Sequence, residues 1–147
     1  MLNRSDVEDL IPHKGTMCLL DRVLSWDALH ISLATQTHSD ANNPLRDSTG
    51  LRGLRAIHLC EYGAQAMAVH GALLARLHGQ STEITPGMLA SLRAVKLRCD
   101  FIHDLPSELI VHAECLHASD ALLQYGFRVL HQESLVAEGR AAVVLRH

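Results

Sequence analysis

Hydrophobic and polar residues alternate along most of the second half of the chain, with the period of two that is typical of β-strands. The clearest case is segment 122–132, in which every second residue from Leu123 to Val129 is apolar. Three further segments of this half are predicted to be strands: 88–101, 107–118 and 134–146. Because residues 118–120 and 132–134 suit hairpin turns, the last three strands are predicted to form an antiparallel meander.

Segment 88–101 is predicted to alternate strictly, so that Leu89 and Arg93 lie on one face while Leu92 and Lys96 lie on the other. Three cations of this segment are candidates for contact with an acidic partner: Arg93, Lys96 and Arg98. A solvated strand face is the ordinary role of such residues and stays open as the alternative.

The first part of the chain contains signals of a short helix and two strands. Segment 3–11 is predicted to be a helix with Ser5 as N-cap, and Glu8 three residues later completes the sequence pattern of a capping box. Segments 17–27 and 28–38 are predicted to be strands that are joined by a tight turn.

A long polar segment and a long apolar segment follow. Segment 39–55 is interrupted by glycines and is predicted to be a loop, and long ordered loops are often functional. Segment 56–79 has no proline, is rich in alanine and glycine, and ends on Gly79, so it is predicted to be a helix. A helix that is apolar nearly all round is buried, either in a bundle or, as we expect, inside a curved sheet.

The order of short helix, two strands, loop, long helix and four strands predicts an α+β architecture in a single domain, residues 1–147. One helix covers only one face of a single antiparallel sheet. We therefore expect the remaining edges or faces to be covered by a second subunit in a homodimer, and a heterodimer stays open.

Composition excludes several classes of protein. Hydrophobic residues make up 48% of the chain, which suffices for a core, and the net charge of -3 without a basic run argues against nucleic-acid binding. No apolar run approaches the roughly 20 residues that a membrane span needs, and the first residues do not resemble a signal peptide. The 4 cysteines form no CxxC pair, which favours free thiols in the cytoplasm. The 11 histidines are scattered, so no metal site is expected.

Two motifs give the chain a resemblance to a known family. Residues 11–24, IPHKGTMCLLDRVL, and residues 61–67, EYGAQAM, resemble the opening motif and the central-helix signature of the hotdog-fold 3-hydroxyacyl-acyl-carrier-protein dehydratases. The closest resemblance is to a divergent branch that is found beside polyketide and aryl-polyene gene sets. This resemblance implies a hotdog fold, in which a curved antiparallel sheet wraps a long central helix, and a hydro-lyase activity without a cofactor.

The resemblance directs attention to Glu61 and His58. Dehydration of a 3-hydroxyacyl thioester needs a base at C2, an acid at the 3-hydroxyl and donors for the thioester oxygen, and a helix N-terminus can supply such donors. Glu61 is expected to lie on the buried helix, where burial favours the protonated form of a carboxyl group, so it is the candidate acid. The family's base is a loop histidine, and the matching segment around Asp47 contains none.

His58 is the candidate substitute for that base, because it lies three residues before Glu61 and would share a helical face with it. The alternatives are that His58 only binds backbone and that Glu61 is a buried carboxyl group satisfied by local donors. Gln65 and Gly53 are candidate substrate-binding residues, although the resemblance also suggests that Gln65 braces a loop. His13, in the first motif, is expected to be a structural anchor.

Three functions stay open at this point. The first is elimination of water from 3-hydroxyacyl groups that are bound as thioesters to acyl carrier protein, which would give trans-2-enoyl products. The second is a hotdog acyl thioesterase. The third is a non-catalytic acyl-binding or partner subunit of a dehydratase, which the missing loop histidine favours.

Overall fold

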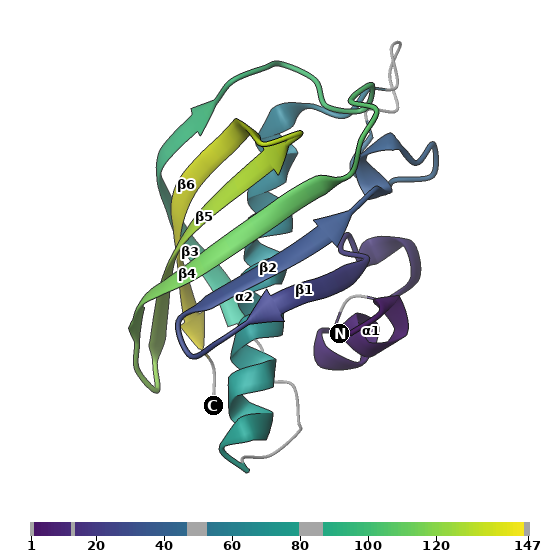
Figure 1. Cartoon of the computed structure of the whole chain (residues 1–147). Coiled ribbons are helices and arrows are strands. Elements are labelled where there is room, and N and C mark those ends of the chain that lie inside the picture. Colours follow the sequence, from purple (N-terminus) through teal and green to yellow (C-terminus); the bar gives the residue numbers. More distant parts are fainter. Residues whose placement is uncertain (1, 13, 47–52, 80–86, 146–147) are drawn as a thin grey trace.

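The computed structural model describes residues 2–12, 14–46, 53–79 and 87–145 of the chain. It contains two α-helices, three short 3-10 turns and six strands in these residues (Figure 1). The elements are α1 Arg4–Leu10, η1 Gly15–Met17, β1 Arg22–Trp26, β2 His30–Thr35, η2 Thr37–Ser39, η3 Ala56–His58, α2 Leu59–Leu77, β3 Gly87–Leu97, β4 Leu109–Ala118, β5 Leu122–His131 and β6 Ser134–Leu145.

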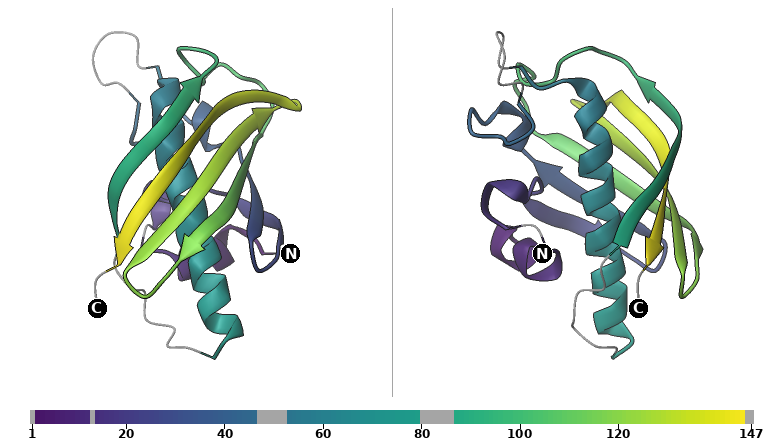
Figure 2. Two further views of the ribbon diagram at one scale, coloured as in Figure 1. Left: turned by 90° about the vertical axis from the view of Figure 1, so that its left-hand side faces the viewer. Right: turned by 180° about the vertical axis from the view of Figure 1, so that it is seen from behind.

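The six strands form one antiparallel sheet in the order β1-β2-β4-β5-β6-β3, and this sheet curves around α2 (Figures 1 and 2). The predicted α+β hotdog fold is therefore confirmed, and so is the meander of the last three strands. The end of α2 extends beyond the sheet, so Leu77 in its last turn is largely exposed (Figure 2). None of the helices in the described ranges is long and apolar enough to cross a membrane.

Small residues let α2 lie close to the sheet. A Cβ atom on Gly63 of α2 would lie 2.6 Å from the ring of Phe127 on β5, and one on Gly139 of β6 would lie 2.9 Å from the same ring. The Phe127 ring therefore packs directly against backbone on two sides and is almost fully buried. At the far end of α2, Gly79 adopts a positive φ of 67°, as expected for the residue that follows a helix C-terminus.

The first helix begins earlier than the sequence predicts. Its N-cap is Asn3, whose side chain accepts a hydrogen bond from Asp6 N at 3.0 Å, while the Asp6 carboxylate accepts one from Asn3 N at 3.0 Å. The predicted cap at Ser5 is therefore wrong, because Asn3 and Asp6 form the same reciprocal pair two residues upstream.

Residues 17–21 are not part of a strand, although they were predicted to begin one. The Arg4 guanidinium on α1 donates hydrogen bonds to the carbonyl oxygens of Gly15, Cys18 and Leu20 and to Asp21. These bonds hold the segment against α1 in place of strand pairing. The strand proper, β1, begins at Arg22 and pairs with β2.

Two register shifts interrupt the alternation predicted for β3. They fall between Leu89 and Ser91 and between Arg93 and Lys96, where Ala94 has a positive φ of 54°. Residues directly opposite each other in antiparallel strands point to the same face. Leu89, Leu92 and Leu97 oppose β6 residues of the inner face, whereas Arg93 and Lys96 oppose Arg140 and Glu138 of the outer face. The prediction that Leu92 and Lys96 share a face is therefore wrong, because each bulge inserts a residue.

Candidate functional site

The candidate site lies where a 3-10 turn leads into α2. His58 is the last residue of η3 and the N-cap of α2, and Glu61 lies in the first turn of the helix. This placement follows from the sequence, since three residues of separation bring two side chains to one face of a helix. The prediction that His58 lies at the mouth of the helix is confirmed.

His58 and Glu61 form a contact, with Nδ1 of the imidazole 3.3 Å from Oε1 of the carboxylate. The His58 side chain is 30% exposed and the Glu61 side chain 49% exposed. The burial predicted for Glu61 is therefore not found in the single chain, because Glu61 lies on the side of α2 that the sheet does not cover. Both groups can reach a bound molecule.

Most backbone donors at this helix end are already used. Ala56 N donates to Asp100 O at 2.9 Å, and His58 N donates to Arg55 O at 3.1 Å. Ile57 N, between them, has no acceptor within the described residues. The sequence predicted a free set of donors for a thioester oxygen, and the structure reduces that set to Ile57 N at the entrance.

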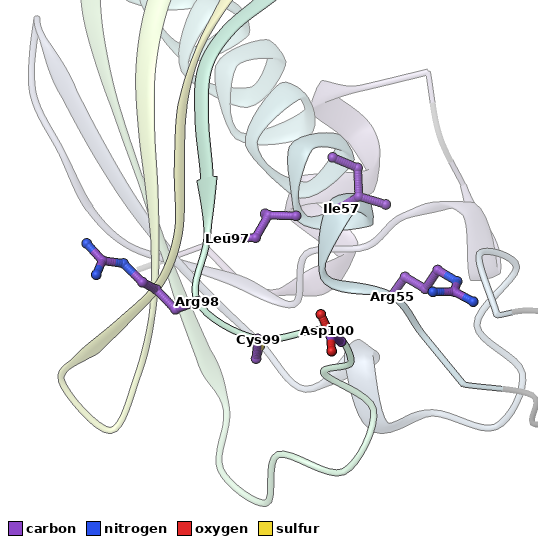
Figure 3. Close-up of a pocket in the computed structure, with 6 residues that line it drawn as sticks. All are labelled: Arg55, Ile57, Leu97, Arg98, Cys99 and Asp100. Atoms are coloured by element: carbon purple, nitrogen blue, oxygen red, sulfur yellow. The ribbon is translucent and has the colours of Figure 1, made fainter.

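An open hollow of about 440 Å³ lies beside this turn, between η3 and the segment that follows β3. Figure 3 shows the Asp100 carboxylate directed toward Leu97 and Ile57, while Arg98 and Arg55 point away from the hollow on opposite sides. Ile57 is one helical turn before Glu61, so the hollow and the carboxyl group lie on the same side of the helix. Asp100 was not identified from the sequence, where its only signal is an acid two residues after the last of three closely spaced cations, Arg98.

Gln65, one turn beyond Glu61, is buried and holds the segment that leads to β1. Its Nε2 donates to Met17 O at 2.8 Å, and its Oε1 accepts from Leu19 N at 2.8 Å. Both ends of the amide thus bind backbone, which is the bracing arrangement that the resemblance suggested. A contact between Gln65 and substrate stays a prediction.

Gly53 has a packing reason for lacking a side chain. A Cβ atom there would lie 2.8 Å from the His103 ring and 2.9 Å from the Phe101 ring. The next residue, Leu54, donates its N–H to His103 Nδ1 at 3.1 Å, which fixes the backbone in this position. Substrate binding by Gly53 stays a prediction, and the neighbouring Gly50, Asp47 and the anchor residue His13 lie outside the described residues.

The hydroxyl of Tyr62, the residue after Glu61, lies in a buried polar cluster that was not identified from the sequence. The buried hydroxyl of Tyr62 lies 2.9 Å from Thr37 Oγ1 and accepts from Asn43 Nδ2 at 3.0 Å. Thr37 Oγ1 in turn donates to Leu19 O at 2.6 Å. Burial raises the pKa of Tyr62, which keeps its hydroxyl neutral. The cluster fixes the first turn of α2 to the segment after β2.

Among the described residues, no group of three or more His, Cys, Asp or Glu side chains is arranged to hold a metal ion. The four cysteines are free thiols, and burial raises the pKa of Cys18, Cys60 and Cys99.

Comparison with known proteins gives one family. The model of the ApeP-like family, described as ApeP dehydratase, matches residues 5–146. No curated protein matches this sequence.

Solved structures with the same fold include one named as a dehydratase heterocomplex, ApeI:P from Xenorhabdus doucetiae. Its matched chain is 19% identical with a TM-score of 0.84, and the match covers 96% of this chain and 91% of that one. A conserved protein from Pseudomonas aeruginosa is 17% identical with a TM-score of 0.62, at coverages of 95% and 98%. A hypothetical thioesterase from Streptococcus pneumoniae, solved with coenzyme A, is 13% identical with a TM-score of 0.56, at coverages of 85% and 84%.

Proposed function

Because this chain belongs to the ApeP-like dehydratase family, we propose that it takes part in the elimination of water from 3-hydroxyacyl thioesters carried by acyl carrier protein. The observation that carries the proposal is the contact of 3.3 Å between His58 and Glu61 at the entrance of α2. The two groups are partly exposed, and Ile57, which directly precedes His58, lines a hollow large enough to admit part of an acyl thioester, although His58 and Glu61 themselves do not line it. A reducing compartment, the cytoplasm, is the location that we expect.

In this reaction His58 acts as base and Glu61 as acid. The Nδ1–H of neutral His58 donates to Glu61 Oε1, which leaves Nε2 free to remove the C2 proton. To act as the acid, Glu61 must carry a proton on Oε2, and we expect the bound substrate to cover this carboxyl group, which is 49% exposed in the single chain, and so to favour that form. Oε2 then gives its proton to the 3-hydroxyl group. The C3–O bond breaks, water leaves, and the C2–H electrons form the C2=C3 double bond. The resulting imidazolium and carboxylate then return to their starting forms by proton transfer.

Ile57 N–H is the backbone donor that we assign to the thioester oxygen. Ile57 is one of the residues that line the hollow, and its N–H group lies near the N-terminus of α2, where the helix dipole is positive. Charge that develops on that oxygen is stabilised by such a donor, so the carbonyl is expected to face η3 while C2 faces His58.

A second role is favoured by a different observation. The segment that should contain the family's loop histidine has none, and the relative from Xenorhabdus doucetiae is named as part of a heterocomplex. In this second role Glu61 stays the acid, the base belongs to another subunit, and the chain alone is inactive.

Assays on the purified chain separate the two roles. Enoyl product from 3-hydroxyacyl-acyl-carrier-protein substrates is measured for wild type, His58→Ala and Glu61→Gln, with His78→Ala as a control because His78 is exposed at the opposite end of α2. If wild type is active, both site variants should lose about 10²-fold or more in kcat while the control keeps its rate.

If the wild-type chain is inactive but binds acyl carrier protein, the partner-subunit role is supported and catalysis by the chain alone is excluded. Activity that survives both site variants would remove His58 and Glu61 from the mechanism. Hydrolysis of the thioester in place of dehydration would support the thioesterase function.

A further inference from the structure

One wall of the hollow beside η3 is fixed by backbone bonds between two segments, the one after β3 and the one that leads into α2. Ala56 N donates to Asp100 O at 2.9 Å, and the neighbouring residues Arg55 and Phe101 form a β-bridge. The backbone of Asp100 is thereby held beside Ile57, which directly follows Ala56. These bonds do not involve the Asp100 side chain, so a substitution at this position leaves them in place.

The Asp100 carboxylate is the charge that faces into this hollow. Figure 3 shows it directed toward Leu97 and Ile57, whereas the guanidinium groups of Arg55 and Arg98 point away. Arg55 instead lies over an aromatic ring, 5.0 Å from its centroid. The carboxylate forms no hydrogen bond or ion pair within the part of the chain that the structure describes. Its oxygens are therefore available to a bound molecule.

The groups around the hollow favour a neutral ligand that carries a hydrogen-bond donor. A carboxylate only accepts hydrogen bonds, so it binds a donor such as an amide N–H and repels anions. Ile57 and Leu97 supply apolar walls, and burial raises the pKa of Cys99, which keeps that thiol neutral. A chain of methylene and amide groups therefore suits the hollow better than a phosphate or a free carboxylate does.

We propose that Asp100 binds the carrier arm of the substrate by accepting a hydrogen bond from the amide N–H group nearest the thioester. Thioesters of acyl carrier protein and of coenzyme A share this arm, in which two methylene groups separate the sulfur atom from the amide nitrogen. With the thioester oxygen at Ile57 N, the arm passes along the same hollow and brings the amide to the neighbouring carboxylate. The inference rests on the proposed function for the identity of the ligand as an acyl thioester.

Two unreactive ligands that differ in a single group test this contact. S-hexanoyl-N-acetylcysteamine contains the thioester and the amide but has no 3-hydroxyl group to lose. In its matched ester, 2-(hexanoylthio)ethyl acetate, an oxygen atom replaces the amide N–H. The dissociation constants of both ligands for the wild-type chain are measured by NMR titration. We expect the amide to bind at least about fivefold more tightly, because the ester has no donor for the charged acceptor.

Substitutions test whether this preference comes from Asp100. Asp100→Ala should bring the two dissociation constants within about twofold of each other, and Asp100→Asn should keep part of the preference, because its amide oxygen still accepts a hydrogen bond. Asp104→Ala is the matched control, since Asp104 is an exposed acid of the same segment that does not line the hollow, and it should leave the preference unchanged. Thermal unfolding checks that each variant is folded.

Two natural ligands identify the source of the arm. Hexanoyl-acyl carrier protein and hexanoyl-coenzyme A contain the same amide, and the one that binds more tightly identifies the carrier that this chain uses. Asp100→Ala should weaken that binding at least about fivefold. An unchanged affinity for both ligands would overturn the proposal.

Equal binding of the amide and the ester by wild type, an absence of binding by either, or a preference that survives in Asp100→Ala would each overturn the proposal as well. If the preference depends on Asp100 but no dehydration is found in any assay, the proposed function fails while the binding of the arm stands. If dehydration depends on Glu61 but the preference does not depend on Asp100, only the Asp100 proposal fails.

Discussion

His58 at the N-cap of α2 and His70 within the helix, about three helical turns apart, have opposite surroundings. His70 has 0% exposed surface, and both of its ring nitrogens are bonded: Nε2 donates to Asp27 O at 2.7 Å and Nδ1 accepts from the Tyr125 hydroxyl at 2.6 Å. His58 is partly exposed, and only its Nδ1 has a partner. A ring with both nitrogens bonded holds structure together, whereas one with a free nitrogen can accept a proton from a substrate. Residue type alone does not distinguish the two.

The largest expected effect is a loss of stability when His70 is substituted. His70→Ala leaves a cavity and deprives the Tyr125 hydroxyl and Asp27 O of their partner, so we expect the free energy of unfolding to fall by about 3 kcal/mol. Urea unfolding followed by circular dichroism measures the loss. A loss below about 1 kcal/mol would contradict the structural role of this ring.

We expect low pH to destabilise the fold through its buried histidines. Burial lowers the pKa of His70, and it lowers that of His38, whose Nδ1 is buried without a partner among the described residues. The unfolded chain therefore binds protons more readily, and stability that is present above about pH 6.5 is lost as pH falls below that value. We expect a loss of about 1 kcal/mol per histidine between pH 7 and pH 5.5, measured by urea unfolding.

A substitution at His70 separates this effect from general acid sensitivity. His70→Gln should reduce the slope of stability against pH, since a neutral amide replaces one of the imidazole rings whose pKa burial lowers. An unchanged slope would assign the acid sensitivity to other groups.

Removal of the Tyr125 hydroxyl tests the same contact with His70, with a smaller expected loss of stability. Burial raises the pKa of Tyr125, so the group stays a neutral donor to His70. Tyr125→Phe removes that donor and leaves Nδ1 of His70 without a partner, for an expected loss of about 1 to 2 kcal/mol. If His70→Ala and Tyr125→Phe act through one hydrogen bond, the double variant should lose less than the sum of the two.

The smallest expected effect on stability is at His58. His58→Ala should change the free energy of unfolding by less than about 0.5 kcal/mol, because its side chain is partly exposed and has a single polar contact. Together with a large loss of kcat in the same variant, this result would assign a catalytic role to His58 and a structural role to His70. A loss as large as that of His70→Ala would give His58 a structural role.

Much of the fold could be predicted from the sequence because strand alternation and helix composition are local signals. The meander and the central helix follow from them, and so does the pairing of His58 with Glu61, which depends only on a spacing of three residues. The exposure of Glu61 could not be predicted, because it depends on which side of α2 the sheet covers. The two bulges of β3 were missed for the same reason: register is set by the facing strand β6.

The contact of Phe127 with two glycines has a consequence for how this sequence can change. A methyl group at Gly63 or at Gly139 would collide with the ring, so either substitution is costly while the ring is present. A smaller residue at position 127 would relieve both collisions. Positions 63, 127 and 139 therefore form an epistatic set, in which a substitution that is harmful alone becomes acceptable after another has occurred.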